Sequence, residues 1–342
     1  MSTKQVVFKK LSRDKSVGIY MGKRDFVDHC DFVEPVDGVV IVDPKLLQGK
    51  KAFVVLCCTF RYGRDDDDNV LASSSAGSCT GAASRRSCCT SWAATLTPSS
   101  SRWGWGHWGA WLWCVAHVNL CVLYPTHQFP DNLPCSVQPA PTDVGKKCAV
   151  EFEVKAFCAK GHDDKVQKRS SVSLAIRKVQ YAPERGGAPP SVELSREFGA
   201  SEKALHVEAC LEKQGTYYHG EPIGVHVNIS NGSSKTVKNI IVMVEQVANV
   251  VLYSNDSYAE TVATVETPDT VESGASLQAT YTILPLLANN RKQRGIALDG
   301  KLKHEDTNLA SSSIVKDGVL PEVLGILVSY RLLVKLVVGG SV

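Results

Sequence analysis

A group of basic residues near the N-terminus is the feature of this sequence best suited to bind a ligand. The group comprises Lys9, Lys10, Arg13, Lys15, Lys23 and Arg24. Ammonium groups that converge on one point bind phosphate as mobile charges. Lysines also protect exposed edge strands, so a solvated edge explains the same residues equally well. On a strand, Lys9 and Lys10 face opposite sides unless a bulge or a strand end lets both reach solvent.

Two further charged segments extend or border this group. Lys50, Lys51, Lys301 and Lys303 join a phosphate-binding patch only if the fold brings them there. A turn is expected just before the charged run Arg64, Asp65, Asp66, Asp67 and Asp68. A segment with this charge cannot lie in a core, so it is either an inert solvated loop or a loop presented to a partner.

Catalytic and metal-binding patterns are nearly absent. The sequence contains none of the motifs GxSxG, HExxH, GxxxxGK[ST] or GxGxxG. His304–Glu305–Asp306 is similar to an acid–base cluster, but no second histidine follows four residues on, so we expect a structural role there. An enzyme that uses His304 and Glu305 stays a minor alternative. We expect no catalytic residues, no metal and no cofactor.

The composition excludes some classes of protein. Lys and Arg number 38 against 35 Asp and Glu, and the net charge of +3 is too small for a chain that binds nucleic acid through its bulk charge. The twelve cysteines never occur as CxxC and no signal peptide is evident, so we expect free thiols in a reducing cytosol. With 44% hydrophobic residues, most of the 342-residue chain can bury a core.

Alternating hydrophobic runs predict an all-β protein. The clearest runs are residues 17–20, 39–42, 52–56, 149–157 and 171–176. No long segment with a 3.6-residue period interrupts them, which favours sandwiches over a parallel α/β sheet. The Pro- and Gly-rich segment 182–191 is the expected linker between two tandem antiparallel β-sandwich domains of immunoglobulin-like type, at 1–181 and 192–342.

Residues 69–128 fit neither predicted domain. All six tryptophans lie between Trp92 and Trp113, and residues 103–124 contain no Asp, Glu, Lys or Arg. This uncharged length suits a transmembrane helix, which would make the chain a membrane-anchored β-protein. A poorly ordered insert or a sequence error explains the segment better, because polar β-domains flank it and Gly–Trp repeats are unusual in a membrane span.

Several motifs outside that segment resemble the arrestin family. They are VFKK at 7–10, GKRDFVDH at 22–29, EPVDGVV at 34–40, TFRYG at 59–63, LPCSV at 133–137, IRKVQ at 176–180, YYHGEP at 217–222 and GIALDGKLKHEDTNLA at 295–310. The last run is long and highly specific. Residues 11–17 and 245–253 are most similar to the visual branch of the family. The resemblance covers residues 1–68 and 129–338.

This resemblance implies a protein that binds light-activated, phosphorylated rhodopsin, or a related G-protein-coupled receptor, and blocks its G protein. Lys9 and Lys10 would guide receptor phosphates, and the loop that begins at Arg64 would enter the receptor's cytoplasmic cavity. A polar core would hold the basal state through Asp25, Asp299 and Asp306, with Lys303 as the gate lysine. A receptor phosphate would compete for the cationic partner of these carboxylates and release the interdomain lock.

The same resemblance implies a cytoplasmic photoreceptor protein that reaches the membrane only through its receptor. An inositol phosphate would suit the basic patch, and no nucleic acid is expected as a partner.

The sequence departs from the family at three places. The family's phosphate-sensing arginine falls at Ser173, so we expect Asp25, Asp299 and Asp306 to lack compensation and the basal state to be loosened. The match stops before the family's last C-domain strands and C-tail, so we expect a truncated C-domain. Residues 69–128 replace two strands and a helix.

A shift of reading frame would explain the third departure. One back-translation of residues 88–101, read one nucleotide earlier, gives LLHKLGGNAYPFLL, which resembles the family's helix and the strand after it. A frameshift followed by a retained intron, and hence a non-functional product, is therefore an alternative to a working receptor-binding protein.

Overall fold

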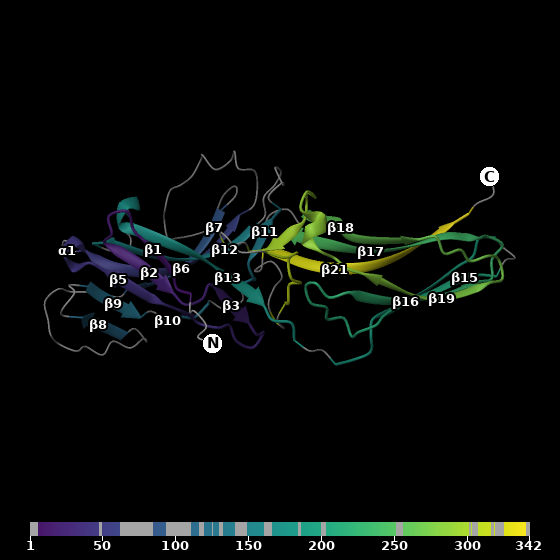
Figure 1. Ribbon diagram of the computed structural model, residues 1–342, viewed down its shortest axis with the longest axis horizontal. Helices are drawn as coiled ribbons and strands as arrows, with labels where there is room; N and C mark the ends of the chain where they lie inside the picture. Colours follow the sequence, from purple (N-terminus) through teal and green to yellow (C-terminus); the bar gives the residue numbers. More distant parts are fainter. Residues whose placement is uncertain are drawn as a thin grey trace.

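Two antiparallel β-sandwiches lie end to end along the long axis of the computed structural model (Figure 1). The structure describes residues 6–47, 50–61, 85–93, 111–115, 120–124, 126–129, 133–140, 149–160, 166–183, 186–199, 203–250, 256–300, 302, 307–315, 318 and 325–339. The predicted all-β sandwich class is confirmed. Helix within these ranges is confined to three short turns: α1 (Pro44–Leu47), the 3-10 turn η2 (Lys168–Ser170) and α2 (Leu287–Asn290).

The N-terminal sandwich pairs a five-stranded sheet with a larger one. The first sheet has the order β1 (Phe8–Leu11), β2 (Val17–Met21), β5 (Val39–Val42), β9 (Leu120–Tyr124) and β8 (Trp111–Val115). The second runs β20 (Ala297–Asp299), β11 (Val137–Pro139), β12 (Ala149–Ala159), β13 (Ser171–Gln180) and β3 (Asp25–Asp28). Beyond β12, this sheet continues through β6 (Lys51–Arg61) and β7 (Arg85–Ala93). A short ladder joins β4 (Val36–Asp37) to β10 (Thr126–His127).

The C-terminal sandwich has a four-stranded and a three-stranded sheet. The first has the order β14 (Ser191–Arg196), β15 (Leu205–Leu211), β16 (Ile223–Asn231) and β19 (Ser276–Ile283). The second has the order β18 (Asp256–Thr267), β17 (Val237–Val250) and β21 (Ile326–Val338). Side chains along β16 alternate, with Val225, Val227 and Ile229 buried and the residues between them exposed. A period of two places all the apolar residues on one face, which is why this sequence folds as a half-buried strand.

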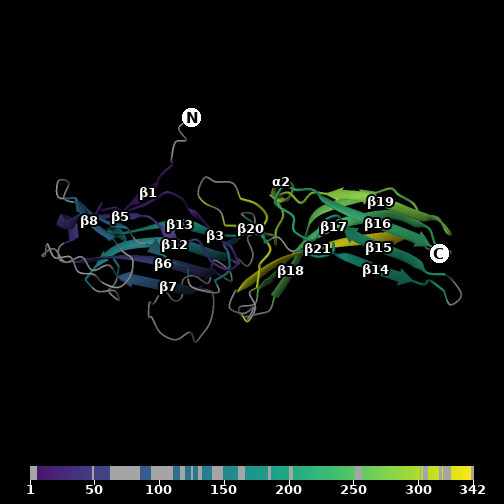
Figure 2. The same cartoon turned by 90° about the horizontal axis from the view of Figure 1, so that it is seen from below.

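One strand crosses from the C-terminal half of the chain into the N-terminal sheet. β20 pairs antiparallel with β11, with Val137 opposite Asp299 and Pro139 opposite Ala297. Figure 2 shows β20 at the junction of the two sandwiches. This pairing places Asp299 at the edge of the N-terminal sheet.

Parts of 69–128 join the N-terminal sheets, contrary to the expectation that the segment fits neither domain. β7 pairs along its length with β6, and β9 pairs with β5. The sequence of β9, LCVLY, has the β-branched and aromatic residues that suit a strand. The described part of 103–124 forms strands, and no helix in the described part of the chain is long and apolar enough to cross a membrane. The described residues of the predicted membrane-spanning segment are therefore strands and not the expected helix.

One buried ion pair ties β3 to β13. Lys178 Nζ lies 2.6 Å from Asp28 Oδ2, with side-chain exposures of 2% and 8%. The ammonium also donates to the carbonyl of Leu133 at 2.6 Å, and Asp28 Oδ1 accepts from the backbone N–H of Cys30 at 2.9 Å. These extra hydrogen bonds offset the desolvation of both charges, which a buried pair requires.

Candidate functional site

β1 presents two lysines at an open edge of the five-stranded sheet. Among the described strands β1 pairs only with β2, with Lys9 opposite Tyr20 and Lys10 opposite Ile19. Both lysines are exposed. Because β1 is a short edge strand, both ammonium groups reach solvent although the side chains leave opposite faces.

Cationic side chains extend from β1 and from the start of β3 to the edge of β13. Lys10 Nζ donates to the carbonyl oxygen of Ser173, and Arg24 Nε donates to the carbonyl oxygen of Ala175, both at 2.7 Å. β3 pairs with β13 only from Arg177 onward, so before that point side chains cover this edge. The Arg24 guanidinium also lies 5.5 Å from the centre of the Phe8 ring.

The outer face of β13 gathers further charge. This face carries Ser171, Ser173, Ala175 and Arg177, which alternate with buried residues. Lys155 on β12 lies directly opposite Ser173, so both side chains leave the same face of the sheet. We call these cations, together with Lys9 on the opposite side of the edge strand β1, the cationic face; its members are Lys9, Lys10, Arg24, Lys155 and Arg177.

The turn between β1 and β2 is fixed by Asp14. Its Oδ1 accepts hydrogen bonds from Ser12 Oγ at 2.8 Å, from Ser16 Oγ at 2.6 Å and from the Ser16 N–H at 3.0 Å. Its Oδ2 accepts from Ser170 Oγ at 2.6 Å, which ties the turn to η2. Burial alone would raise the pKa of Asp14, but the hydrogen bonds from Ser16, Ser170 and Ser12 outweigh it and hold this pKa well below its ordinary value.

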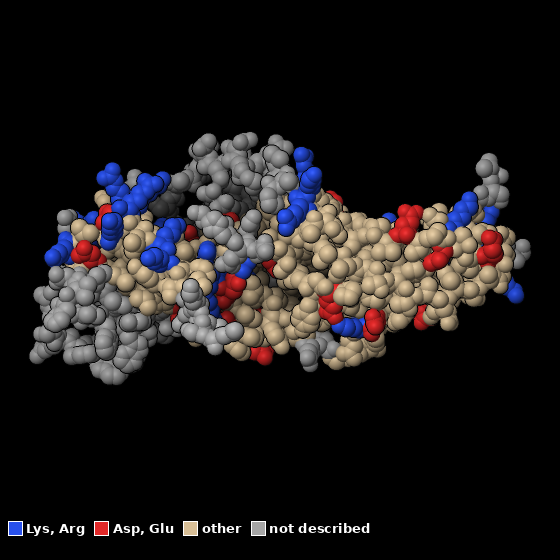
Figure 3. Space-filling model, viewed as in Figure 1, with Lys and Arg blue, Asp and Glu red and all other residues tan. Residues whose placement is uncertain are grey.

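Four predicted phosphate-binding residues lie toward one end of the N-terminal sandwich. The fixed turn exposes Arg13 and Lys15. Lys51 begins β6 opposite Ala159, and the neighbouring thiol of Cys158, whose pKa is raised by burial, interacts with both Ser16 of the turn and Lys50. Figure 3 shows Lys and Arg side chains gathered over this part of the molecule. Lys301 and Lys303 lie outside the described residues, as does the predicted receptor loop 64–68.

Arg177 connects the N-terminal sheet to the segment that follows β20. Its Nε and Nη2 donate to Asp25 Oδ1 and Oδ2, each at 2.6 Å, and its Nη1 donates to the carbonyl of Gly300 at 3.1 Å. A Cβ at Gly300 would lie 2.7 Å from Ser136 Cβ and 3.1 Å from Arg177 Cγ, so only glycine allows this close approach. One guanidinium therefore joins Asp25 to the chain next to Asp299.

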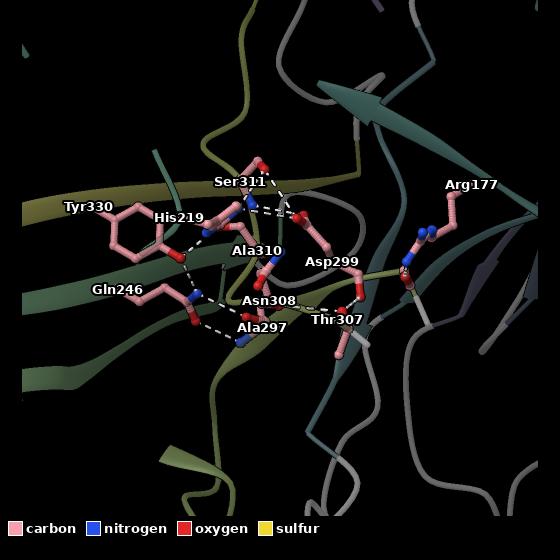
Figure 4. A network of polar contacts seen from close by, with 11 residues as sticks. Arg177, His219, Gln246, Ala297, Asp299, Thr307, Asn308, Ala310, Ser311 and Tyr330 are labelled. Atoms are coloured by element: carbon pink, nitrogen blue, oxygen red, sulfur yellow. Dashed lines mark hydrogen bonds and ion pairs between the residues drawn. The ribbon is translucent and has the colours of Figure 1, made fainter. Parts of the chain in front are cut away.

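Asp299 itself is held by the C-terminal half. Its Oδ1 accepts from the Ser311 N–H at 2.9 Å, and its Oδ2 lies 3.2 Å from Ser311 Oγ and 3.3 Å from His219 Nε2 (Figure 4). Its carbonyl accepts from Thr307 Oγ1 at 2.6 Å. The YYHGEP motif thus supplies, through the His219 imidazole, a partner for this carboxylate.

A buried amide and a phenol complete the junction. Gln246 Oε1 accepts from the N–H of Ala297 at 2.6 Å, and its Nε2 donates to the Ala297 carbonyl at 2.9 Å and to Tyr330 Oη at 2.7 Å (Figure 4). Tyr330 in turn donates to the Ala310 carbonyl at 2.5 Å, and burial raises its pKa. This network fixes the start of β20 against β17 and β21.

The expectation that Asp25 lacks a cationic partner is wrong. Arg177 lies four residues after Ser173 on the same strand face, and the parallel register of β13 and β3 sets it opposite Asp25. Asp299 turns to Ser311 and His219 instead. Asp306, His304 and Glu305 lie outside the described residues.

Sequence reasoning missed two members of the cationic face, Lys155 and Arg177, and it did not place Arg24 at the edge of β13. Arg177 was visible inside the IRKVQ motif, and a period of two along the strand groups it with Ser173. Its partnership with Asp25 depends on a parallel register between distant segments, which no local pattern encodes.

The known proteins that are similar to this chain all belong to one family. The arrestin (or S-antigen) C-terminal domain matches residues 201–342. S-arrestin of Xenopus laevis is 49% identical over 99% of this chain and 83% of its own length, and S-arrestin of Homo sapiens is 51% identical over 98% and 81%. Beta-arrestin-2 of Bos taurus is 50% identical over 98% of this chain and 78% of its own length. With this identity across both sandwiches and the junction between them, the chain belongs to the arrestin family.

Proposed function

We propose that this protein binds an activated, phosphorylated G-protein-coupled receptor through the cationic face and thereby ends signalling to the G protein. Light-activated rhodopsin is the receptor of choice, because the S-arrestins are among its close relatives. The protein acts by occupancy and not by catalysis. It works in the photoreceptor cytoplasm and reaches the membrane through its receptor.

The observation that carries this proposal is the hydrogen bond from the Lys10 ammonium to the uncharged main-chain carbonyl of Ser173. Lys10 Nζ and Arg24 Nε donate to main-chain oxygens of Ser173 and Ala175 at an open strand edge. Both bonds already have a charged donor, and a phosphate oxygen adds full negative charge on the acceptor side, so it attracts these cations more strongly than a carbonyl dipole does. A receptor phosphate therefore displaces the carbonyls, while the phosphopeptide backbone can pair with the edge of β1.

A receptor phosphate can also compete for Arg177, at the junction between the two sandwiches. The guanidinium is 13% exposed and joins Asp25 to the carbonyl of Gly300. A phosphate that reaches it competes with Asp25 and with Gly300, which loosens the contact between the two halves. We assign to Arg177 the sensing role that the family resemblance places at residue 173, with Asp25, Asp299 and Asp306 as the carboxylates of the polar core.

The remaining assignments rest on the family. We place the domains at 1–181 and 192–342 with the linker 182–191 between them. The loop at Arg64–Asp68 enters the receptor cavity, and Lys301 and Lys303 join the phosphate-binding residues. Arg13, Lys15, Lys50 and Lys51 form a second basic patch that suits an inositol phosphate.

The test is binding of the full chain to rhodopsin in washed disc membranes, phosphorylated or not, in light or darkness. We expect strong pelleting only with the light-activated, phosphorylated form. The double variant Lys9→Ala/Lys10→Ala is expected to lose at least tenfold in apparent affinity, because two charge-assisted contacts disappear.

The matched control is Lys238→Ala/Lys335→Ala, which removes two exposed lysines from the C-terminal sandwich at the same change of net charge. It is expected to bind like the parent chain. Equal losses in the two double variants would show that bulk charge, and not the cationic face, supplies the affinity. Equal pelleting with unphosphorylated rhodopsin would refute phosphate recognition.

A further inference from the structure

The residues around Ser171 match the sequence pattern that basic-directed serine kinases recognise. Lys168 and Arg169 precede it by three and two positions, and Val172 follows it. Kinases of this class select substrates by two cations before the acceptor serine and an apolar residue after it. The segment KRSSV has this pattern with Ser171, and not Ser170, as the acceptor.

The structure makes Ser171 the more accessible of the two serines. Ser170 is 6% exposed, and its hydroxyl is held by Asp14 at 2.6 Å. Ser171 is half-buried on the outer face of β13, and its Oγ lies 3.4 Å from the Lys168 carbonyl, a long hydrogen bond. Gln167, Lys168 and Arg169 are exposed, so a kinase can reach its recognition cations.

The local backbone can open to enter a kinase cleft. η2 is a single 3-10 turn with no side chain capping its start at Gln167. Extending it breaks the backbone hydrogen bond from Ser170 to Gln167 and two bonds to Asp14, one from Ser170 Oγ and one from the Asp14 N–H to the Arg169 carbonyl.

A phosphate on Ser171 would lie among cations. Ser173, two residues on and about 6.6 Å away along the strand, has Lys10 at its carbonyl oxygen. Lys155 is the diagonal cross-strand neighbour of Ser171, because it pairs with Ser173 while Ser171 pairs with Phe157. Long side chains reach across such a diagonal. Phosphoserine 171 can therefore bind both Lys155 and Lys10.

We infer that Ser171 is a phosphorylation site for a basic-directed serine kinase, and that its phosphate captures Lys10 and Lys155 and so closes the cationic face to a receptor phosphate. In the reaction the Ser171 Oγ forms a bond to the γ-phosphorus of ATP. The bond from that phosphorus to ADP breaks, and the hydroxyl proton leaves to the kinase base. The modification itself is independent of the proposed function, whereas its effect on receptor binding rests on it.

The first experiment maps the modification. The full chain is incubated with Mg-ATP and the catalytic subunit of cAMP-dependent protein kinase, and the products are analysed by intact and peptide mass spectrometry. We expect one phosphate per chain on Ser171, none on Ser171→Ala, and at least a tenfold slower reaction for Arg169→Gln. Ser170→Ala is the matched control and keeps the phosphate. Modification of Ser171→Ala at the parent rate, or no incorporation while a peptide substrate reacts in the same tube, overturns the assignment.

The second experiment tests capture of the cations without any receptor. Phosphorus NMR of the modified chain follows the second ionisation of phosphoserine, ordinarily near pH 6. Lys10 and Lys155 are expected to lower this pKa by about 0.5 or more relative to the phosphorylated peptide KRSSVS. Lys10→Ala/Lys155→Ala is expected to remove the difference. A value equal to that of the peptide in the parent chain refutes the capture.

Binding to phosphorylated rhodopsin then separates the two proposals. The modified chain is expected to bind at least fivefold more weakly than the unmodified chain, and phosphatase treatment is expected to restore binding. Failure of the unmodified chain to bind contradicts the proposed function and leaves the mapped site standing. Equal binding by both forms contradicts the regulation alone.

Discussion

Arg177 and Asp25 form a two-pronged ion pair, with both carboxylate oxygens at 2.6 Å from guanidinium nitrogens on neighbouring parallel strands. Bidentate geometry is the strongest form of this contact, and only arginine provides it. The same guanidinium holds the Gly300 carbonyl, so the pair is also a link between the first sheet and the chain that returns from the second sandwich.

Replacing Arg177 by Gln is expected to lower the free energy of unfolding by about 1–3 kcal/mol, because charge-assisted hydrogen bonds to Asp25 and Gly300 are lost. Urea unfolding followed by fluorescence measures this change. Arg331→Gln is the control, because its pair with Glu245 has 56% of the arginine side chain exposed and should contribute less than about 0.5 kcal/mol. Equal effects of the two substitutions would show that the Arg177 link adds nothing to the junction.

Ser173→Arg is expected to increase discrimination between phosphorylated and unphosphorylated rhodopsin about fivefold or more. A guanidinium at 173 adds a second cation to the strand face that carries Arg177, and this cation would hold the basal state more firmly until a phosphate arrives. Pelleting with both membrane preparations gives the ratio, with Ser173→Ala as control. A ratio that does not change would remove residue 173 from the sensing mechanism.

Lys178→Met is expected to destabilise the chain by about 3–5 kcal/mol, since it leaves the Asp28 carboxylate buried without its cation. Adding Asp28→Asn neutralises the stranded charge, so the double variant should recover part of the loss in denaturant unfolding. A double variant that loses the sum of the single losses would mean that the two side chains act independently.

Asp14→Asn is expected to destabilise the β1–β2 turn in a pH-dependent manner. The pKa of Asp14 lies below its ordinary value in the folded chain, so its contribution is full above the unfolded pKa of about 4 and fades as the pH falls through the acid range. At pH 7 the loss should be about 1–2 kcal/mol, from charge-assisted hydrogen bonds at a solvent-facing turn. The difference between parent and variant should narrow below pH 4, and a constant difference from pH 7 to pH 3 would contradict this account.

Periodicity and composition predicted the all-β class and the two sandwiches, because the alternation of apolar and polar residues can be recognised within each strand alone. The exposure of Lys9 and Lys10 on a short edge strand was one of the alternatives that the sequence offered, whereas the contact of Lys10 with Ser173 joins distant segments. The junction was predictable only in part. The pairing of Arg177 with Asp25 and of Gln246 with Ala297 depends on how segments 152 and 51 residues apart align, and no local signal carries that alignment.

The expectation that residues 69–128 join neither domain relied too heavily on composition. The composition of this segment suggested a foreign insert. In the structure, however, β7 pairs with β6 and β9 pairs with β5, so both strands extend the N-terminal sheets. A sheet edge accepts any strand of adequate β-propensity, so membership of a sheet is a weaker demand on sequence than membership of a core.

The crossing of β20 sets the order of events during synthesis. The edge of the N-terminal sheet at β11 stays unfinished until residues 297–299 have left the ribosome, by which time most of the C-terminal sandwich has already been made. The N-terminal half must therefore wait, with a template edge exposed, for about 160 further residues at synthesis rates of 5–20 residues per second. For about 10 to 30 seconds a nascent chain is open to a strand from its neighbour on the same messenger, which makes the joint between the two sandwiches a natural place for domain-swapped assembly to begin.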